Sequence, residues 1–200
     1  MKTTKYTLAF LLCLLLCACG GNNAGKTDGL TGKVTLPEYE GKQVYLETTS
    51  ATAQKVDSAV VKNGTFTFTF IDSIPQVYTL VLGTSADDQY PITLPVVSEK
   101  GAISVVMGKL VLTSGTPLND NLQDFLLAVS NFTDKAMKQE KPDMQQVKAD
   151  FSKLVEGAVM QNIKTPVGIY IYKNYSHNLT EAQAAKILDA ASESFKEAIK

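Results

Sequence analysis

The feature that most constrains the fold of this chain is a change of hydrophobic period at Thr116. Before it, apolar and polar residues alternate, most clearly over residues 65–70, where threonine and phenylalanine take turns. After it, apolar residues recur every three or four positions. A period of two is typical of half-buried strands, and the longer period indicates helices. The chain therefore divides into a strand-rich segment, residues 30–115, and a helical segment, residues 116–200.

Short strands separated by turn signals are predicted throughout the first segment. Their ranges are 30–36, 44–49, 55–61, 65–70, 77–82, 92–97, 103–107 and 109–113. Asn63 and Gly64 favour a tight hairpin turn, because both residues tolerate positive φ. Pro91 and Pro95 favour an edge strand. Without helical crossovers between the strands, the pattern predicts an antiparallel β-sandwich or a flattened barrel.

Two helical stripes of similar length follow Thr116. The first holds Leu118, Leu122, Phe125, Val129, Phe132 and Ala136, and the second holds Met144, Val147, Phe151, Leu154 and Ala158. Thr116 is the expected N-cap and Pro117 the first helical residue. A polar break near Pro142 separates the stripes, so an antiparallel helical hairpin is expected, with its phenylalanines in the core.

Two more helices are expected after the hairpin. Pro166 starts a short apolar helix that runs to Tyr175, and Thr180 with Gln183 forms a capping box for a last helix. That last helix carries Leu188, Ala191 and Phe195 on its apolar face. The predicted fold class is therefore α+β, with the sheets first and the helices second.

The N-terminus has the pattern of a lipoprotein signal. Two lysines, Lys2 and Lys5, precede an apolar stretch over residues 8–16, and Ala18 is the small residue before the expected cleavage. The stretch is shorter than the roughly 20 residues that a bilayer-spanning helix needs, so it is expected to be a removable leader, residues 1–18. Cys19 would then be the lipidated first residue of the mature chain, anchored by acyl chains that contribute about 0.8 kcal/mol per buried methylene.

The segment 19–29 is rich in glycine and asparagine and is expected to be a flexible tether. About ten such residues reach roughly 17 Å, which keeps the folded part near the lipid surface. No acidic run follows Cys19, in contrast to many surface-exported lipoproteins of Bacteroidota. The expected location is the cell envelope, lipid-anchored in the outer membrane and facing the periplasm.

Charge and cysteine content exclude several classes of function. All 19 basic residues are lysine, so the planar guanidinium that best recognises phosphate and guanine is absent, and no nucleic-acid partner is expected. The three cysteines lie at or before Cys19. The mature fold is therefore expected to contain no disulfide, no thiolate nucleophile and no thiolate metal site.

Few residues offer catalytic or metal chemistry. His177 is the only histidine and is expected to lie in a surface loop, since it has no second nitrogen or sulfur ligand for a metal. Asp87 and Asp88 could bind calcium or act as paired acids, but adjacent carboxylates in a loop are usually solvated. The oxygen-rich group Asn119, Asp120 and Asp124 fits the first turns of a helix. No catalytic residue, metal or cofactor is therefore assigned.

A set of motifs in the first segment resembles a known family. They are Gly32 with Val34, Gly41 with Val44 and Leu46, Asp57 with Ser58, Asn63 and Gly64 with Phe66 and Phe68, Gly101 with Ile103, and Gly115 with Thr116 and Asn119. Together they resemble the lipoprotein domain of unknown function that precedes a thioredoxin-like domain in many thiol:disulfide oxidoreductases of Bacteroidota. The resemblance implies an accessory half without the thioredoxin-like domain, because no Cys-x-x-Cys pair follows.

Two further features are weighed against plainer interpretations. Asp57-Ser58-Ala59 and Asp72-Ser73-Ile74 resemble acceptor triplets for O-glycosylation in Bacteroidota, which would modify Ser58 and Ser73, although a strand residue and a turn residue explain them as well. Tyr170, Tyr172, Tyr175 and His177 could form a platform for a sugar ring, but tyrosines next to isoleucines are more often core residues.

The function expected from these observations is a non-catalytic binding or scaffolding role at the envelope. Its partners would be the membrane, through the lipid anchor, and an envelope protein; any small-molecule ligand is unknown. Two alternatives stay open. The chain could be the anchor half of a split thiol:disulfide oxidoreductase system, or a carboxylate-dependent envelope hydrolase.

Overall fold

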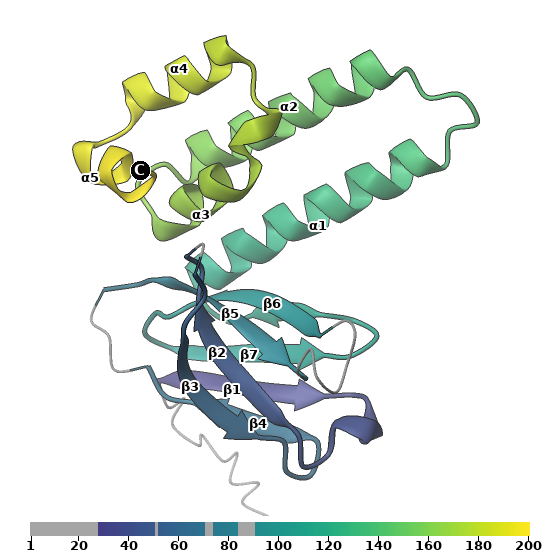
Figure 1. Ribbon diagram of the computed structural model, residues 1–200, viewed down its shortest axis with the longest axis vertical. Coiled ribbons are helices and arrows are strands. Elements are labelled where there is room, and N and C mark those ends of the chain that lie inside the picture. Colours follow the sequence, from purple (N-terminus) through teal and green to yellow (C-terminus); the bar gives the residue numbers. More distant parts are fainter. Residues whose placement is uncertain (1–27, 51, 71–73, 84–90) are drawn as a thin grey trace, which may run out of the picture.

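The computed structural model describes residues 28–50, 52–70, 74–83 and 91–200. Within these ranges, eight strands form two four-stranded sheets, and the helices follow them in the chain (Figure 1). The expected class, α+β with a sandwich of sheets followed by helices, is confirmed.

The first sheet has the strand order β4-β1-β7-β8. Its strands are β1 (Gly29–Val34), β4 (Thr65–Phe68), β7 (Ala102–Met107) and β8 (Leu112–Ser114). The β1–β4 and β7–β8 pairs are antiparallel, but β1 and β7 are parallel. The prediction of an antiparallel sandwich is therefore wrong for this one pair. Parallel neighbours need a long crossover, and here the chain supplies it by building the second sheet between β1 and β7.

The second sheet has the order β3-β2-β5-β6, and all its neighbouring strands are antiparallel. Its strands are β2 (Gln43–Thr48), β3 (Lys55–Val60), β5 (Val77–Leu82) and β6 (Ile92–Val97). β6 lies at an edge, as Pro91 and Pro95 predicted, because an edge position leaves the missing N–H of a proline without consequence for the ladder.

The Asn63–Gly64 turn has the predicted conformation but a different place in the fold. Its two residues have φ of 53° and 68°. The turn joins β3 of the second sheet to β4 of the first, and only Lys62 and Thr65 pair across it. It is therefore a corner between the sheets rather than a hairpin within one of them. The carboxylate of Glu40 accepts the N–H groups of Asn63 and Gly64 at 2.8 and 2.9 Å and fixes this corner.

Alternate residues of both sheets form one hydrophobic core. Its strand residues include Leu30, Val44, Leu46, Phe66, Phe68, Leu80, Leu82, Leu94, Val96, Ile103, Val105 and Met107, all buried. Close packing demands a glycine at one point: a Cβ on Gly32 would lie 2.0 Å from the ring of Phe66 on the neighbouring strand. Burial of this apolar surface is the main stabilising contribution to the sandwich.

The helical segment begins at Pro117. Its helices are α1 (Pro117–Met137), α2 (Met144–Gln161), α3 (Pro166–Tyr175), α4 (Glu181–Ala190) and α5 (Glu193–Ala198), with short 3-10 turns η1 (Pro37–Tyr39) in the sandwich and η2 (Ser176–Asn178) after α3. The hairpin of α1 and α2, the helix from Pro166 and the Thr180–Gln183 capping box are confirmed.

The single last helix that the sequence predicted is wrong, because it is broken after α4. Ala191 is extended, and the hydroxyl of Ser192 accepts the N–H of Phe195 at 3.2 Å, which starts α5 as a new helix. Ala191 and Phe195 are still buried in the core, as the sequence predicted, because the break turns the chain without exposing them. Ile187, rather than Leu188, is the fully buried residue of α4.

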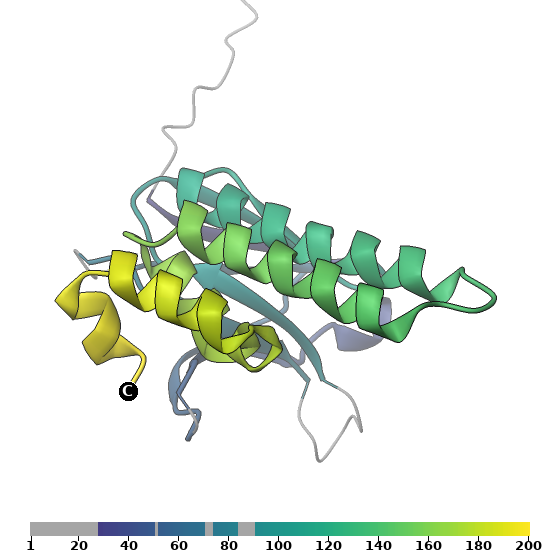
Figure 2. The same cartoon turned by 90° about the horizontal axis from the view of Figure 1, so that it is seen from above.

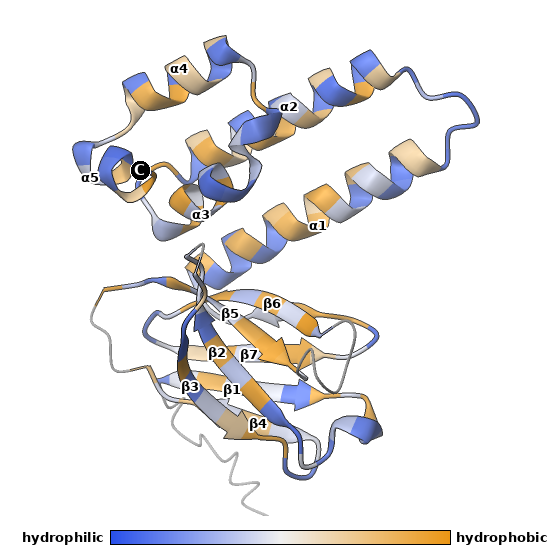
Figure 3. Cartoon of the chain, viewed as in Figure 1, coloured by the Kyte–Doolittle hydropathy of each residue, from blue (hydrophilic) through white to orange (hydrophobic). Residues whose placement is uncertain are grey.

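The helices form a second core on one side of the sandwich. Val97 at the end of β6 packs with buried residues of all five helices: Leu122, Phe125, Val155, Val159, Val167, Ile171, Ile187 and Phe195. The α1–α2 connection projects beyond the strands (Figures 1 and 2). Hydrophobic residues, in orange, occur along the strands and both helices of the hairpin, whereas the connection is blue and hydrophilic (Figure 3).

Candidate functional site

Two side-chain amides on α1 fix the base of the hairpin to the sheets. Asn119, which is fully buried, accepts the N–H of Val97 at 2.9 Å and donates to the carbonyl of Val97 at 2.8 Å. Gln123, one turn later, accepts the N–H of Thr113 at 2.7 Å. Val97 belongs to edge strand β6 and Thr113 to edge strand β8. One helix therefore satisfies backbone groups at an edge of each sheet, where an unpaired buried group would be costly.

Other side chains complete the start of α1. A carboxylate oxygen of Glu99 accepts the N–H groups of Leu118 and Asn119 at 2.7 and 3.2 Å. Thr116 occupies the predicted N-cap position but makes no capping bond, because its hydroxyl accepts the Asn119 amide at 2.8 Å. Glu99 thus provides the negative group that the helix N-terminus favours.

The oxygen-rich group at residues 119, 120 and 124 is divided between structural roles and solvent. Asn119 is engaged with β6, and Asp120 accepts the N–H of Gly115 at 2.9 Å. Asp124 is exposed and faces the groove between α1 and α2. The plainer interpretation, that these residues belong to the first turns of a helix, describes them correctly.

The outer half of the hairpin, from Phe132 on α1 to Phe151 on α2, leaves large apolar side chains exposed to solvent. Met137 at the end of α1 is 80% exposed, and Met144 at the start of α2 is 57% exposed. Phe132 and Phe151 pack against each other with ring centroids 5.2 Å apart, yet both stay half-buried. The prediction that the hairpin phenylalanines are all core residues is correct for Phe125 and wrong for Phe132, while Phe151 packs against the helical core but stays half-buried. Within the described residues, no further element closes over this end of the hairpin.

A row of aromatic rings connects the helical core to the outer half. Phe125 meets Tyr175 edge to face at 5.0 Å, Tyr175 lies 6.4 Å from Phe151, and Phe151 contacts Phe132. Such pairs add about 0.5–1.5 kcal/mol each beyond the area that they bury. The outer half is therefore held in place by edge-on and tilted ring contacts that continue from the core, although its surface is open.

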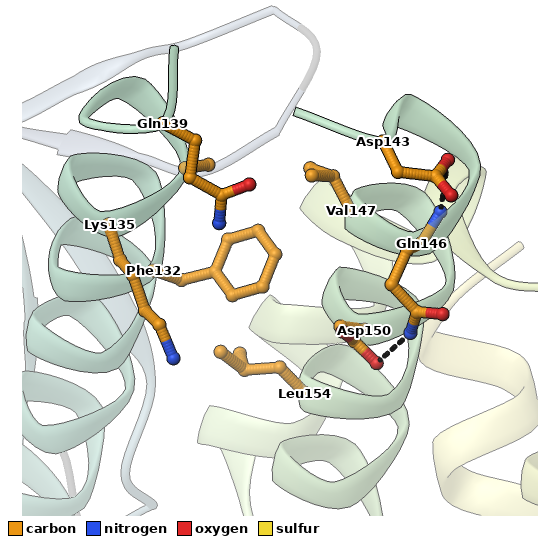
Figure 4. Close-up of a pocket in the computed structure, with 9 residues that line it drawn as sticks. Phe132, Lys135, Gln139, Asp143, Gln146, Val147, Asp150 and Leu154 are labelled. Atoms are coloured by element: carbon orange, nitrogen blue, oxygen red, sulfur yellow. Dashed lines mark hydrogen bonds between the residues drawn. The ribbon is translucent and has the colours of Figure 1, made fainter. Parts of the chain in front are cut away.

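Two grooves flank the outer half of the hairpin and share Phe132, Ala136 and Val147. The first, which we name the polar groove, has a volume of about 350 Å³, and the second, the tip groove, about 590 Å³. The polar groove is also lined by Lys135, Gln139, Asp143, Gln146, Asp150 and Leu154 (Figure 4). The tip groove is also lined by Thr133, Met137, Pro142, Met144, Lys148, Phe151, His177 and Asn178.

The carboxylates of the polar groove already have structural partners. Asp143 is the N-cap of α2 and accepts the N–H groups of Gln145 and Gln146 at 2.9 and 3.3 Å. Asp150 accepts the side-chain amide of Gln146 at 2.8 Å, and this bond, with the nearby Lys153, holds the pKa of Asp150 below its ordinary value (Figure 4). Both carboxylates therefore already have hydrogen-bond partners within helix α2.

A polar network fastens α4 to α2. The side-chain oxygen of Gln183 accepts the hydroxyl of Ser152, and its amide donates to Glu156 at 2.9 Å. Lys186 donates to the other Glu156 oxygen at 2.7 Å. Hydrogen bonds from Lys186 and then Gln183 lower the pKa of Glu156, so this carboxylate remains ionised between the two helices.

The tyrosines of α3 pack into the helical core. Burial, reinforced by the neighbouring Tyr175, raises the pKa of Tyr170 to about 12, and burial also raises the pKa of Tyr175. Tyr172 meets Phe195 edge to face at 5.7 Å. The core interpretation of these residues therefore describes them better than a platform for a sugar ring.

Some of the remaining predicted residues lie within the described part of the chain and some lie outside it. Cys19, Ser73 and the pair Asp87 and Asp88 lie outside the described residues. Ser58 is exposed in edge strand β3, where its N–H donates to the Asp57 carboxylate at 2.7 Å. His177 is exposed in η2, as expected for a surface position, and it lies at the rim of the tip groove.

The described part of the chain has neither a cluster of metal ligands nor a helix that could span a membrane. Across residues 28–50, 52–70, 74–83 and 91–200, no three histidine, cysteine, aspartate or glutamate side chains come together in a way that suits a metal ion. Over the same ranges, no helix has the length and apolar character to cross a membrane.

This part of the chain is a two-sheet sandwich domain in which α1 is hydrogen-bonded to an edge strand of each sheet. Residues 29–122 match the family model described as Domain of unknown function (DUF4369). The matched range contains both sheets and Asn119, and it ends before the outer half of the hairpin. No curated protein matches the chain. The resemblance noted in the sequence is thus supported as a domain of unknown function.

Sequence reasoning missed both the Asn119–Gln123 attachment and the tip groove. The attachment had a weak signal, since two amides four residues apart stand on one helix face that also carries Leu122. The tip groove had a clearer one, because Met137 and Met144 stand on either side of the polar connection, where a buried hairpin would end in polar residues.

Proposed function

We propose that this chain is a lipid-anchored protein of the cell envelope with a non-catalytic binding or scaffolding role, and that the tip groove is its binding surface. The observation that carries the proposal is the exposure of Met137 and Met144 beside the half-buried pair Phe132 and Phe151. Contiguous exposed apolar surface is costly to leave in water and commonly marks a site of interaction. The groove volume, about 590 Å³, is in the range of binding pockets.

The anchor rests on the N-terminal pattern. Leu16, Cys17 and Ala18 precede Cys19, and a glycine-rich stretch follows before β1 begins at Gly29. A lipid on Cys19 would hold the sandwich near the outer membrane on its periplasmic side. The hairpin would then present its groove to a second envelope component.

The likeness to domains that precede thioredoxin-like domains supports a more specific version of this role. In that version the second component is a separate thiol:disulfide oxidoreductase, and this chain is its membrane anchor. The match of residues 29–122 to a model for a domain of unknown function agrees with the domain half of that likeness.

The anchor is tested by a Cys19→Ser variant in the native cells. The expected result is loss of the lipid mass and release of the protein from the membrane fraction. Unchanged membrane attachment in this variant, or an unlipidated Cys19 in the wild type, would contradict the proposal.

The binding role is tested by site-specific photo-crosslinking in the same cells. A photoreactive residue at Met137 is expected to give a discrete crosslinked product, whereas the same residue at Leu110, an exposed leucine of the sandwich, is not. Equal products from both positions, or none from Met137, would contradict a binding role for the tip groove.

A further inference from the structure

The two grooves of the hairpin share a floor but differ in charge. Phe132, Ala136 and Val147 line both. The polar groove adds a lysine and two carboxylates, Asp143 and Asp150. Among the described residues that line the tip groove, Lys148 is the one with a fixed charge and none is acidic. The hairpin therefore has a mixed-charge side and a side that combines apolar surface with a positive group.

Lys148 is available to a partner. It is exposed on α2, and no carboxylate of the described ranges forms an ion pair with it. Lys153 and Lys186, by contrast, are paired with Asp150 and Glu156 at 3.5 and 2.7 Å. A lone lysine beside an apolar groove attracts an occupant that carries a carboxylate.

The lining has the geometry that receives a helix. On α1 the lining residues are 132, 133, 136 and 137, and on α2 they are 144, 147, 148 and 151. Each set follows the spacing of one helix face, so the groove runs between two antiparallel helices, where a third helix completes a small bundle. Methionine side chains adapt to the surface of an incoming helix, which is the usual reason for their presence in such grooves.

From these observations we infer that the tip groove binds an amphipathic helix of another protein, with an apolar stripe that seats on Phe132 and Phe151 and a carboxylate that pairs with Lys148. This inference rests on the proposed binding role and names its partner class. The charge of the groove disfavours other occupants from this chain. A second copy seated symmetrically on this groove would bring its own Lys148 to the interface, and the leader carries only the positive charges Lys2 and Lys5.

The test uses the full lipidated chain in phosphatidylcholine nanodiscs and fluorescent model helices. Each helix has about 18 residues, or five turns, with leucine on one stripe and either glutamate or lysine elsewhere. A third helix has serine in place of leucine. Fluorescence anisotropy is expected to show the glutamate helix binding about tenfold more tightly than the lysine helix, and the serine helix not binding.

Paired variants separate the groove from the rest of the hairpin. Lys148→Glu is expected to reverse the preference between the two charged helices, whereas Lys135→Glu, the same change on the polar groove, keeps it. Met137→Glu is expected to abolish binding, and Leu110→Glu, an equally exposed apolar-to-acid change on the sandwich, to leave it intact. Circular dichroism melts verify that all four variants fold.

Several outcomes would overturn the inference. Equal binding of the glutamate and lysine helices by the wild type would do so, as would a Lys135→Glu effect as large as that of Lys148→Glu. A dimer in sedimentation velocity that Met137→Glu dissolves would assign the groove to a second copy. Tighter binding of phosphatidylglycerol vesicles than of any helix, lost in Met137→Glu, would assign it to a lipid surface. Crosslinking from Met137 in cells without helix binding would leave the binding role intact and refute this partner class.

Discussion

Similar apolar residues are buried in the sandwich but exposed or half-exposed in the outer half of the hairpin. In the sandwich, Phe66, Phe68 and Met107 are buried to 3%, 4% and 0% exposure. In the hairpin, Phe132 is half-buried and Met137 is 80% exposed. Both regions have well-formed secondary structure, so the difference lies in what covers the apolar face.

Because of this difference, one apolar surface stabilises the fold and the other stays available for binding. The sandwich encloses its apolar surface between two sheets, and that burial stabilises the fold. The hairpin is stabilised at its base, through Asn119 and the helical core, and leaves its outer surface uncovered. A surface that contributes little to stability can be shaped to suit a partner with little effect on the packing of the fold.

The largest expected effect is at Phe68. The Phe68→Ala variant should lower the free energy of unfolding by about 3–5 kcal/mol, because it opens a cavity in a closed core. Phe132→Ala should cost less than half as much, since solvent already reaches that ring. Urea titration followed by circular dichroism measures both. Equal losses would show that the outer half is packed as tightly as the sandwich.

The next effect is at Asn119, where the two regions are joined. Asn119→Ala should cost about 3 kcal/mol, because it leaves the buried N–H and C=O of Val97 without partners. Hydrogen exchange at the amide of Val97 should accelerate. Asn121→Ala, two residues away and without a side-chain hydrogen bond to the described residues, is the matched control and should change stability little. A similar loss in both variants would contradict the role of Asn119.

A smaller effect is expected at Gln183. Gln183→Ala removes the side-chain bonds to Thr180, Ser152 and Glu156, and it should cost about 1–2 kcal/mol in the free energy of unfolding. The helix signal should fall before the sheet signal in a thermal melt. No change would mean that packing of Ile187 alone holds α4 in place.

Acid should weaken the same link. The pKa of Glu156 is lower in the folded state than its ordinary value of 4.5, so its stabilising contribution is complete above 4.5 and is lost as the pH falls through the folded pKa. The unfolding free energies at neutral pH and at about pH 3 should therefore differ less in Glu156→Gln than in the wild type. An identical pH dependence in both proteins would refute this assignment.

The smallest effect is expected at Met137. Met137→Ala should change the free energy of unfolding by less than about 0.5 kcal/mol, as is usual for an exposed position. Chemical denaturation, with Met107→Ala as the buried counterpart, measures the contrast. A loss near that of Met107→Ala would mean that the methionine serves the fold rather than a binding surface.

The sequence predicted local structure well because local structure follows from period and end signals. The segment 77–82 became β5 and 92–97 became β6, and Pro166 and the Thr180–Gln183 box begin α3 and α4. These features depend on neighbours in the chain, whose side chains alternate or repeat in a readable way.

The errors concern relations between distant segments. Alternation could not reveal that β1 lies parallel to β7, or that the Asn63–Gly64 turn joins two different sheets. A helical stripe predicts which side of a helix is apolar, but whether Phe132 is covered depends on elements elsewhere in the chain. The tip groove exists because no other described element packs on this surface of the hairpin. Periodicity alone does not predict such a gap.

The most direct test of the binding surface uses methyl NMR of the methionines. With labelled methionine methyl groups, titration with the glutamate helix should shift the signals of Met137 and Met144 and leave Met107, buried at 0% exposure in the sandwich, unchanged. Saturable shifts at these two methyl groups alone are the result that we expect. Shifts at Met107, or none at Met137 and Met144 while the helix binds, would contradict the assignment of the tip groove as the binding site.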